Sequence, residues 1–378
     1  MKIIFIANAD DNWFKEYLER IVVGKFESLE VAVCSLKNTV YKDYYIENNI
    51  SVYTYYSDKG PAGRILHRWF LDNKIKRKYK DVDAIHVHMV NDVNITRLKK
   101  IWKVASKHIV TFWGSDIFRV SDNHLKKYSD VFCRVDTINL LNENMFPRFT
   151  DIYGHEFDDK LTGFDFGCPM YEAIDSIALN MSKIDCKEYL GIAGEDILVP
   201  VGYNSSPEQQ HDKIISAVSS VDEGMKSKIV LLIHFCYNEY SDSEYISEVK
   251  GLLEKSGFRY KIIDRVLDKR EISILRRAAD IFLYAQTTDA LSASVIEYLY
   301  SGCLLVKPDW LSYPELDSRS VKYISYSDFE QLKDAFLEAI DIYDDENRLK
   351  EYQNNRDILW NMNSWEVVAP KWRALYED

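Results

Sequence analysis

Short apolar runs alternate with longer amphipathic stretches along this chain, and the alternation occurs in two successive series. A nearly uninterrupted apolar run is typical of a parallel strand that is buried on both faces. The runs are 2–7, 30–34, 51–55, 84–88, 108–113 and 131–135 in the first series, and 197–201, 228–234, 259–263, 281–285, 303–307 and 322–325 in the second. Their alternation with helical stretches predicts an α/β fold with one doubly wound parallel sheet in each half.

The length of 378 residues is more than one ordinary α/β domain needs and suits two. We expect helices at 13–23, 65–80, 95–107, 211–221, 243–256, 269–279 and 293–301. The predicted domains are 1–175 and 195–350. Residues 351–378 carry acidic amphipathic stretches with Trp360, Trp365 and Trp372, and we expect these helices to return to the first domain.

Charge, cysteine content and the lengths of the apolar runs argue against several kinds of partner and site. The net charge of −12 argues against a nucleic-acid partner. The six cysteines are scattered without a CxxC pair, which fits a reducing cytoplasmic setting and no zinc site. The first residues lack the basic segment of a signal peptide, and no apolar run reaches membrane-spanning length.

One region departs from this acidic balance. Residues 55–107 hold thirteen Lys/Arg against five Asp, a net of 13 − 5 = +8. Within them, the basic stretch 64–80 interleaves Leu66, Trp69, Phe70 and Ile75. Such a stretch fits either an anionic membrane face or a solvated helix face over an ordinary core.

Ligands of open parallel sheets bind outside the carboxyl ends of the strands, so the residues after each run are the first candidates. After 197–201 come Gly202, Asn204, Ser205 and Ser206, before a helix near His211. A glycine turn followed by helix N–H groups suits a diphosphate, but Asn and Ser are equally good helix caps. The sequence leaves both interpretations open.

A second candidate follows the run 281–285, where Asp289 is separated by seven residues from Glu297. Ser292, Ala293 and Ser294 fall at the predicted helix start, whose unpaired N–H groups can hold phosphate. Glu297 lies about one turn further and can reach ribose hydroxyls. By spacing alone, however, Glu297 is also a first-turn acid that complements the helix dipole.

These segments resemble the donor site of GT-B glycosyltransferases, particularly those of glycosyltransferase family 4. The resemblance lies in Arg276-Arg-Ala-Ala-Asp280, in Asp289-x7-Glu297 and in Ser301-Gly302-Cys-Leu-Leu-Val306. It implies two Rossmann-like domains with a cleft between them, with Asp289 contacting the transferred sugar and Glu297 the nucleotide ribose. The chain departs from the family pattern in having Asp at the first acidic position, and Ala290 and Ser292 where glycines are usual.

The loop 201–211 resembles the phosphate loop of the bacterial 4-acetamido-4,6-dideoxygalactose (Fuc4NAc) transferases, as does the spacing of Tyr237, Tyr245, Ile246 and Val249. We therefore expect Tyr237 to contact the donor. The basic residue that usually follows this loop is missing before Lys213, which leaves His211 as the nearest candidate to neutralise the diphosphate.

The first half supplies the expected acceptor side. Residues 111–119 resemble a T-x-H-G-x-D segment that lines the cleft in many GT-B enzymes, with Trp113 at the position of the histidine. Asp116 is either a general base for the acceptor hydroxyl or a helix cap. Arg119 of this segment is a further acceptor candidate, as are Asn8 and Asp10 after the first strand. His88 ends the strand 84–88 and is either an acceptor residue or an ordinary core or rim histidine.

Taken together, the sequence predicts a metal-independent, hexosyltransferase-like glycosyltransferase. It would move a sugar from a nucleoside-diphosphate sugar to a saccharide or lipid-linked glycan in bacterial surface polysaccharide synthesis. Asp81-Val-Asp83 precedes a strand and is not expected to bind metal, and no cofactor is expected. The alternatives are an epimerase-type protein on the same fold and a non-catalytic sugar-binding protein. Retention or inversion stays open, because family 4 retains and the Fuc4NAc transferases invert.

Overall fold

The computed structural model describes residues 1–236 and 242–377. The chain forms two compact units. Unit 1 comprises residues 1–167 together with the segment from Trp365 onward, and unit 2 comprises Cys168–Ser364. The sequence placed the first domain at 1–175 and the second at 195–350, whereas the units meet at Gly167 and Cys168.

Unit 1 contains one parallel sheet with the strand order β3-β2-β1-β4-β5-β6-β7. Its strands are β1 (Lys2–Ile6), β2 (Glu30–Ser35), β3 (Ser51–Thr54), β4 (Val82–His88), β5 (Ala105–Phe112), β6 (Thr137–Leu140) and β7 (Leu161–Thr162). The central strands are almost wholly buried, as their apolar sequences predict.

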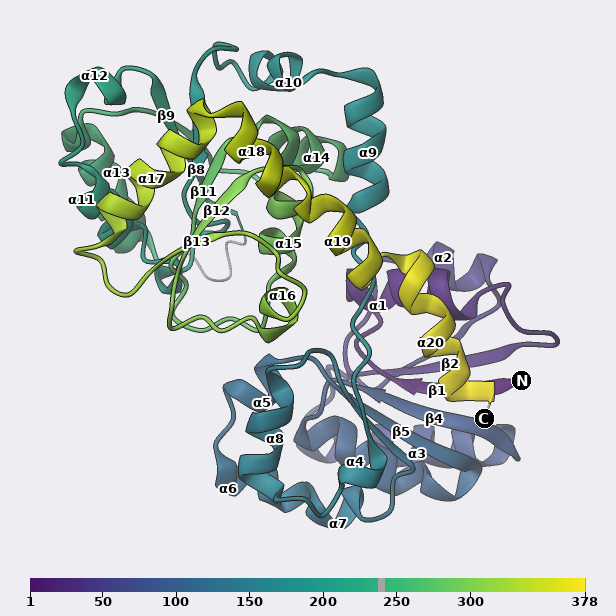
Figure 1. The fold of residues 1–378 in the computed structure, drawn as a ribbon. Helices are drawn as coiled ribbons and strands as arrows, with labels where there is room; N and C mark the ends of the chain where they lie inside the picture. The colour runs from purple at the N-terminus through teal and green to yellow at the C-terminus, as the bar shows by residue number, and fades with distance from the viewer. Residues whose placement is uncertain (237–241, 378) are drawn as a thin grey trace. The chain divides into compact units, whose positions relative to one another are not determined.

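The helices of unit 1 lie on both faces of this sheet, with α1, α2 and α20 on one face and α3 and α4 on the other (Figure 1). Its helical segments are α1 (Asn12–Tyr17), η1 (Leu18–Val22), α2 (Lys42–Glu47), α3 (Pro61–Lys78), α4 (Asp92–Ile101), η2 (Trp102–Val104), α5 (Ser115–Phe118), α6 (Asp122–Leu125), η3 (Lys126–Tyr128), α7 (Ser129–Phe132), α8 (Met145–Tyr153), η4 (Asp158–Lys160) and α20 (Trp365–Glu377). The arrangement is the doubly wound one expected from the sequence.

Unit 2 contains two three-stranded parallel sheets, β10-β9-β8 and β11-β12-β13. Their strands are β8 (Ile197–Pro200), β9 (Ile229–His234), β10 (Arg259–Ile263), β11 (Ile281–Leu283), β12 (Leu304–Pro308) and β13 (Ile324–Tyr326). A parallel bridge between Val201 and Leu283 connects β8 to β11. The carboxyl ends of β8 and β11 are therefore neighbours, and each is followed by one of the two predicted donor segments.

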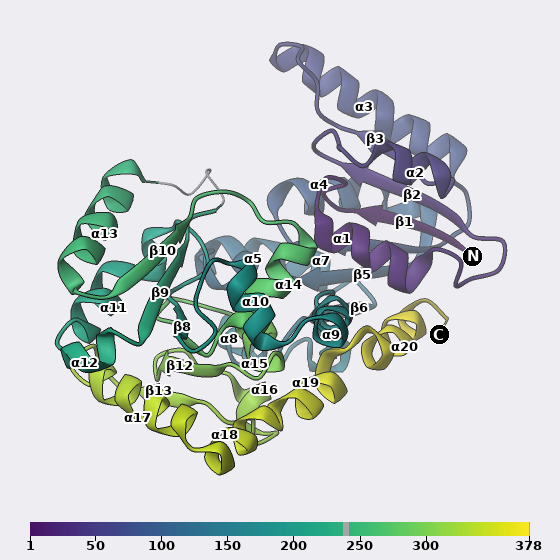
Figure 2. The same ribbon diagram turned by 90° about the horizontal axis from the view of Figure 1, so that it is seen from above.

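Helices cover both faces of the strands of unit 2 (Figure 2). They are α9 (Tyr171–Asn180), α10 (Lys183–Tyr189), η5 (Pro207–Gln209), α11 (His211–Val218), α12 (Glu223–Lys226), α13 (Ser243–Ser256), α14 (Lys269–Ala278), α15 (Ala293–Tyr300), α16 (Pro314–Asp317), α17 (Leu332–Asp344), α18 (Glu346–Gln353) and α19 (Asn355–Asn363). One buried apolar cluster involves α11, α13 and α17, and two others involve α15 with α19 and α10 with α14.

Of the terminal helices, α20 lies in unit 1, and α18 and α19 lie in unit 2. The hydroxyls of Tyr376 and Tyr17 are 2.6 Å apart, and the ring of Trp372 packs edge-on against Tyr17 at 5.1 Å. In contrast, Leu359 and Met362 of α19 are part of a core cluster of unit 2. The sequence predicts that all of 351–378 returns to the first domain, whereas only the part from Trp365 onward lies in unit 1.

The expectation of a strand at 131–135 is wrong. Val131 and Phe132 lie in the short helix α7, and the next strand is β6, which pairs with β5 through Ile109 and Thr137. Val131, Phe132 and Val135 are all buried, and their i, i+1, i+4 spacing also fits one side of a helical turn. A short apolar run does not distinguish the two structures.

Candidate functional site

The loop after β8 begins with Gly202 in a left-handed conformation, at φ +61°. Its backbone N–H donates to the carbonyl of Leu283 (3.0 Å), which holds the loop against the end of β11. A Cβ atom added here would lie 2.6 Å from Nε2 of His211 and 3.0 Å from Oε1 of Gln209. Glycine is therefore required both by the backbone conformation and by the side chains packed beneath the turn.

His211 opens helix α11 and is completely buried. Its Nδ1 lies 2.9 Å from the hydroxyl of Tyr245, which also accepts the backbone N–H of His211. Burial lowers the pKa of the imidazole to about 3, so the ring is neutral at physiological pH. The structure thus places His211 as a packed, uncharged residue under the loop, unsuited to the diphosphate-neutralising role expected from the sequence.

The polar side chains of this loop form hydrogen bonds with the backbone. Ser205 is buried and donates its hydroxyl to the carbonyl of Cys236 (2.8 Å), and Asn204 accepts the N–H of Ser206 (2.9 Å). Ser206 accepts the N–H of Glu208 and caps the short helix η5, whereas the residue at the start of α11 is Gln210, which makes no side-chain capping bond. Tyr237, the further donor candidate, lies outside the described residues.

The segment after β11 ends at Ser292, which precedes the first residue of α15 and makes no side-chain capping bond. Asp289 instead orders this turn, because its Oδ2 accepts the N–H of Ser292 (2.8 Å) and the hydroxyl of Tyr313 (2.6 Å). Burial raises the pKa of Asp289, although these two donors lower it. The N–H groups of Ala293 and Ser294 lie in the first helical turn, where no preceding helical carbonyl can accept them.

Gln286 links the two loops, and sequence reasoning missed it. Its Oε1 accepts hydrogen bonds from the hydroxyls of Tyr203 (3.1 Å) and Tyr284 (2.6 Å) and from Nε2 of Gln209 (3.0 Å). Tyr203 follows β8 and Tyr284 follows β11, so one amide oxygen joins the loops at both strand ends. Its position just after an apolar run was the available signal, but an isolated glutamine there has no specific meaning.

Glu297, the expected ribose ligand, forms a buried ion pair with Arg276 of α14. The Nε of Arg276 lies 2.8 Å from Oε2 of Glu297, and its Nη2 donates to Oγ of Ser294 (3.0 Å). Burial raises the pKa of Glu297, and the adjacent guanidinium acts in the opposite direction. Arg276 thus fixes the carboxylate and the first turn of α15 together, a role that the motif around Asp280 did not suggest.

The acceptor candidates of unit 1 differ in exposure. Asn8 is exposed and accepts the N–H of Asp10 (3.3 Å), while Asp10 is half-buried and accepts the N–H of Val40 (2.7 Å). Both follow β1 at its carboxyl end, where the sequence placed them. Arg119 is exposed at the end of α5.

His88 is a core residue, which corrects its assignment to the acceptor side. Its ring packs among aromatic side chains, with ring centroids 4.7 Å from Tyr17, 5.2 Å from Phe14 and 6.2 Å from the nearly parallel ring of Phe166. Neither ring nitrogen has a hydrogen-bond partner among the described residues. Burial lowers its pKa to about 3. Trp113 remains half-buried, edge-on to Phe166 at 5.1 Å.

Asp116 holds two loops together. Its Oδ2 accepts the N–H of Val90 after β4 (2.7 Å), and its Oδ1 accepts those of Trp113 (2.8 Å) and Gly114 (2.9 Å) after β5. The side chain is buried, and burial raises its pKa to about 6 despite these bonds. These bonds favour a structural role over proton removal from an acceptor. Asp116 lies within α5, whose N-cap is Gly114, so it is not the cap of a helix that begins at Ile117.

Comparison with known proteins supports the fold and the family resemblance. Residues 2–140 match the family described as glycosyl transferase 4-like. No curated protein sequence matched the chain.

Solved structures, in contrast, match along the entire chain. A glycosyltransferase from Rickettsia africae has a TM-score of 0.77 at 14% identity, covering 100% of this chain and 97% of its own. Anabaena Alr3699/HepE in complex with UDP has a TM-score of 0.75 at 13% identity, covering 100% of both chains. A sucrose-phosphate synthase from Thermosynechococcus elongatus has a TM-score of 0.70 at 11% identity, covering 100% of this chain and 98% of its own. The fold is therefore the GT-B fold expected from the sequence.

Proposed function

We propose that this chain is a glycosyltransferase that moves a sugar from a nucleoside-diphosphate sugar to a hydroxyl group of a saccharide or lipid-linked glycan. The observation that carries the proposal is the whole-chain similarity to glycosyltransferase structures, one of which is Anabaena Alr3699/HepE in complex with UDP-glucose. The family match of residues 2–140 supports it independently.

The proposed donor site is the edge of unit 2 formed by the loops after β8 and β11. The N–H groups of Ala293 and Ser294 would receive the diphosphate, as helix N-termini do for anions. Glu297 would bind ribose, and Asp289 would contact the transferred sugar. In the reaction, the acceptor oxygen bonds to the anomeric carbon while the bond to the diphosphate oxygen breaks, and the helix terminus stabilises the leaving charge.

No metal ion enters this proposal, because amide groups and the helix terminus take the place of a cation at the diphosphate. The finer expectations from the sequence also belong here: a Fuc4NAc-type donor and a place in bacterial surface polysaccharide synthesis. They rest on the resemblance of the loop 201–211.

The first test is a thermal-shift panel of UDP, GDP, dTDP, CMP and their sugars with the full chain and without added metal. A ligand at a hundredfold excess over its dissociation constant stabilises the folded state by about 2.7 kcal/mol. We expect one nucleotide to shift the midpoint selectively, and its sugar to be consumed when a glycan acceptor is added. The absence of any shift would overturn the donor-site assignment, and binding without transfer would favour a non-catalytic protein.

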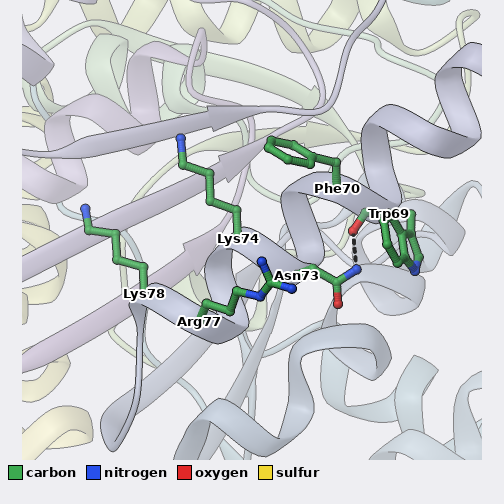
Figure 3. Close-up of a pocket in the computed structure, with 6 residues that line it drawn as sticks. All are labelled: Trp69, Phe70, Asn73, Lys74, Arg77 and Lys78. Carbon is green, nitrogen blue, oxygen red and sulfur yellow. Dashed lines mark hydrogen bonds between the residues drawn. The ribbon is translucent and has the colours of Figure 1, made fainter.

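We also propose that the protein acts at the cytoplasmic face of a membrane, held there by the basic stretch 64–80. No helix in the described part of the chain is long and apolar enough to span a bilayer. Support comes from helix α3, which contains most of this stretch and carries exposed apolar and basic side chains such as Trp69 and Lys74 (Figure 3).

A further inference from the structure

The loop between β12 and α16 presents a tryptophan at the same edge of unit 2 as the proposed donor site. Trp310 lies two residues after the end of β12 and is 42% exposed. Because β12 pairs directly with β11, Trp310 and Asp289 follow adjacent strands. One exposed aromatic side chain is ordinary by itself. Its meaning depends on how the ring is held and on what lies beside it.

The indole of Trp310 is fixed in orientation by contacts within unit 2. Its Nε1 donates a hydrogen bond to the backbone carbonyl of Gln286 (3.0 Å). The ring also packs edge-on against Tyr326, with centroids 5.9 Å apart, and against Phe329 at 5.7 Å. The polar atom of the indole is thus engaged inside the unit, while much of the apolar ring stays open to solvent. A ring held in this way loses little conformational entropy when a ligand covers it.

A buried lysine braces the loop that carries this tryptophan. Lys307 is 3% exposed, and its Nζ donates to the backbone carbonyls of Leu311 (2.7 Å) and Pro308 (3.2 Å). The backbone N–H of Asp309 donates to the carbonyl of Tyr326 (2.9 Å), which ties the loop to the end of β13. Burial of an ammonium group is unfavourable, and it lowers the pKa of Lys307. The chain therefore maintains this loop geometry at an energetic cost, as preorganised binding loops do.

Two hydrogen bonds join this loop to the one that carries the proposed sugar contact. One is the bond from Trp310 to Gln286, and the other runs from the hydroxyl of Tyr313 to Asp289 (2.6 Å). The edge thus combines an exposed apolar ring with a half-buried carboxylate. A pyranose has hydroxyl groups around its rim and C–H groups on its faces, so it matches both. A phosphate does not, because Asp309 is exposed next to the ring and carries a negative charge.

We propose that Trp310 is the platform on which the apolar face of the transferred sugar stacks, while Asp289 accepts hydroxyl groups at the rim of the sugar. The inference rests on the proposed function and identifies a residue that binds the sugar part of the donor. Glu297, the proposed ribose ligand, lies one turn into α15. Trp310 therefore contributes to the affinity for a nucleotide sugar but not to that for the free nucleotide.

The experiment is a calorimetric titration of the full chain with UDP, GDP and dTDP, and with UDP-glucose, UDP-galactose, GDP-mannose and dTDP-glucose. Trp310→Ala removes about 50 Å² of apolar contact, which should weaken binding of the nucleotide sugar about tenfold and leave the free nucleotide unchanged. Trp310→Phe keeps an aromatic face and should lose less than about threefold. The matched control is Tyr260→Ala. Tyr260 is 40% exposed near the amino end of β10, and its loss should change neither affinity.

Wild-type affinity of Trp310→Ala for the nucleotide sugar would overturn the inference. Equal weakening for the free nucleotide and its sugar would also overturn it, since the ring would then act on the base or on the fold. Equal losses in Trp310→Phe and Trp310→Ala would do the same, because the hydrogen bond to Gln286 would then matter rather than the ring face. Thermal denaturation of each variant shows that it is folded at the titration temperature.

The same titrations separate this inference from the proposed function. If the wild type binds none of the nucleotides or nucleotide sugars, the donor site itself is refuted and the platform with it. If the wild type binds a nucleotide and its sugar but Trp310→Ala fails to discriminate between them, only the role of Trp310 is refuted.

Discussion

The buried pair of Arg276 and Glu297 makes a sharp prediction about the stability of unit 2. Replacing Glu297 by Ala leaves a guanidinium in a buried site without its counter-charge, and arginine cannot escape by losing its proton. Breaking one side of a buried pair costs about 3–5 kcal/mol. For a unit of this size, each kcal/mol lowers the melting temperature by about 2–4 °C, so Glu297→Ala should melt roughly 6–20 °C lower.

The two partners should differ in their response to pH. Arg276→Met leaves Glu297 unpaired, but a carboxylate can bind a proton and become neutral, and burial already raises its pKa. The destabilisation by Arg276→Met should therefore shrink as pH falls, whereas that of Glu297→Ala should not. The double variant Arg276→Met/Glu297→Leu should recover most of the lost stability, because an apolar pair of similar volume is often as stable as the ions.

Chemical denaturation of the full chain, followed at several pH values, measures these free energies. Glu338→Ala serves as the control, since Glu338 is exposed in the same unit and its loss should change stability by no more than about 0.5 kcal/mol. A loss below about 1 kcal/mol for Glu297→Ala, or no recovery in the double variant, would refute this reasoning. The result also matters for function, because lost nucleotide binding in Glu297→Ala is informative only at temperatures where the variant is folded.

Three further predictions concern packing and protonation. Gly202→Ala should destabilise unit 2 by more than about 1 kcal/mol, because φ is +61° and the new Cβ would meet His211; an unchanged denaturation midpoint would contradict this. Gln286→Leu should cost about 1–3 kcal/mol by leaving buried donors of Tyr284 and Gln209 unpaired, which urea titration can measure. His88 has a folded pKa of about 3 against about 6.5 unfolded, so the unfolded state binds the proton first and stability falls as pH drops through this window. His88→Phe should remove this loss, about 1.4 kcal/mol per pH unit below 6.5, and parallel pH–stability curves for both proteins would count against it.

Most strands and their parallel arrangement followed from the sequence alone, because a strand covered by helices on both faces must be apolar throughout. The exceptions are β6 and β7, which lie outside the predicted runs. The runs at 2–7, 84–88, 197–201 and 228–234 all overlap strands of the parallel sheets. The same rule indicated the edge where ligands bind, since parallel strands bring their carboxyl ends together. It also indicated Asp289 and Ser292 as candidates. The backbone N–H of Ser292 donates a hydrogen bond to the carboxylate of Asp289 at the start of α15.

Tertiary structure decided what each polar side chain does at that edge. Glu297 meets Arg276 across 21 residues of sequence, and Asp116 receives N–H groups from two separate loops. His88 looked like an accessible strand-end residue, yet side chains from α1 and from the segment before unit 2 enclose it. Burial, charge and partner depend on segments that local sequence cannot bring together, because the free energy of a buried polar group is set by all of its neighbours at once. The sequence therefore determined most of the strands and the edge proposed to bind ligands, whereas only the folded chain determined which side chains at that edge are packed, paired or exposed.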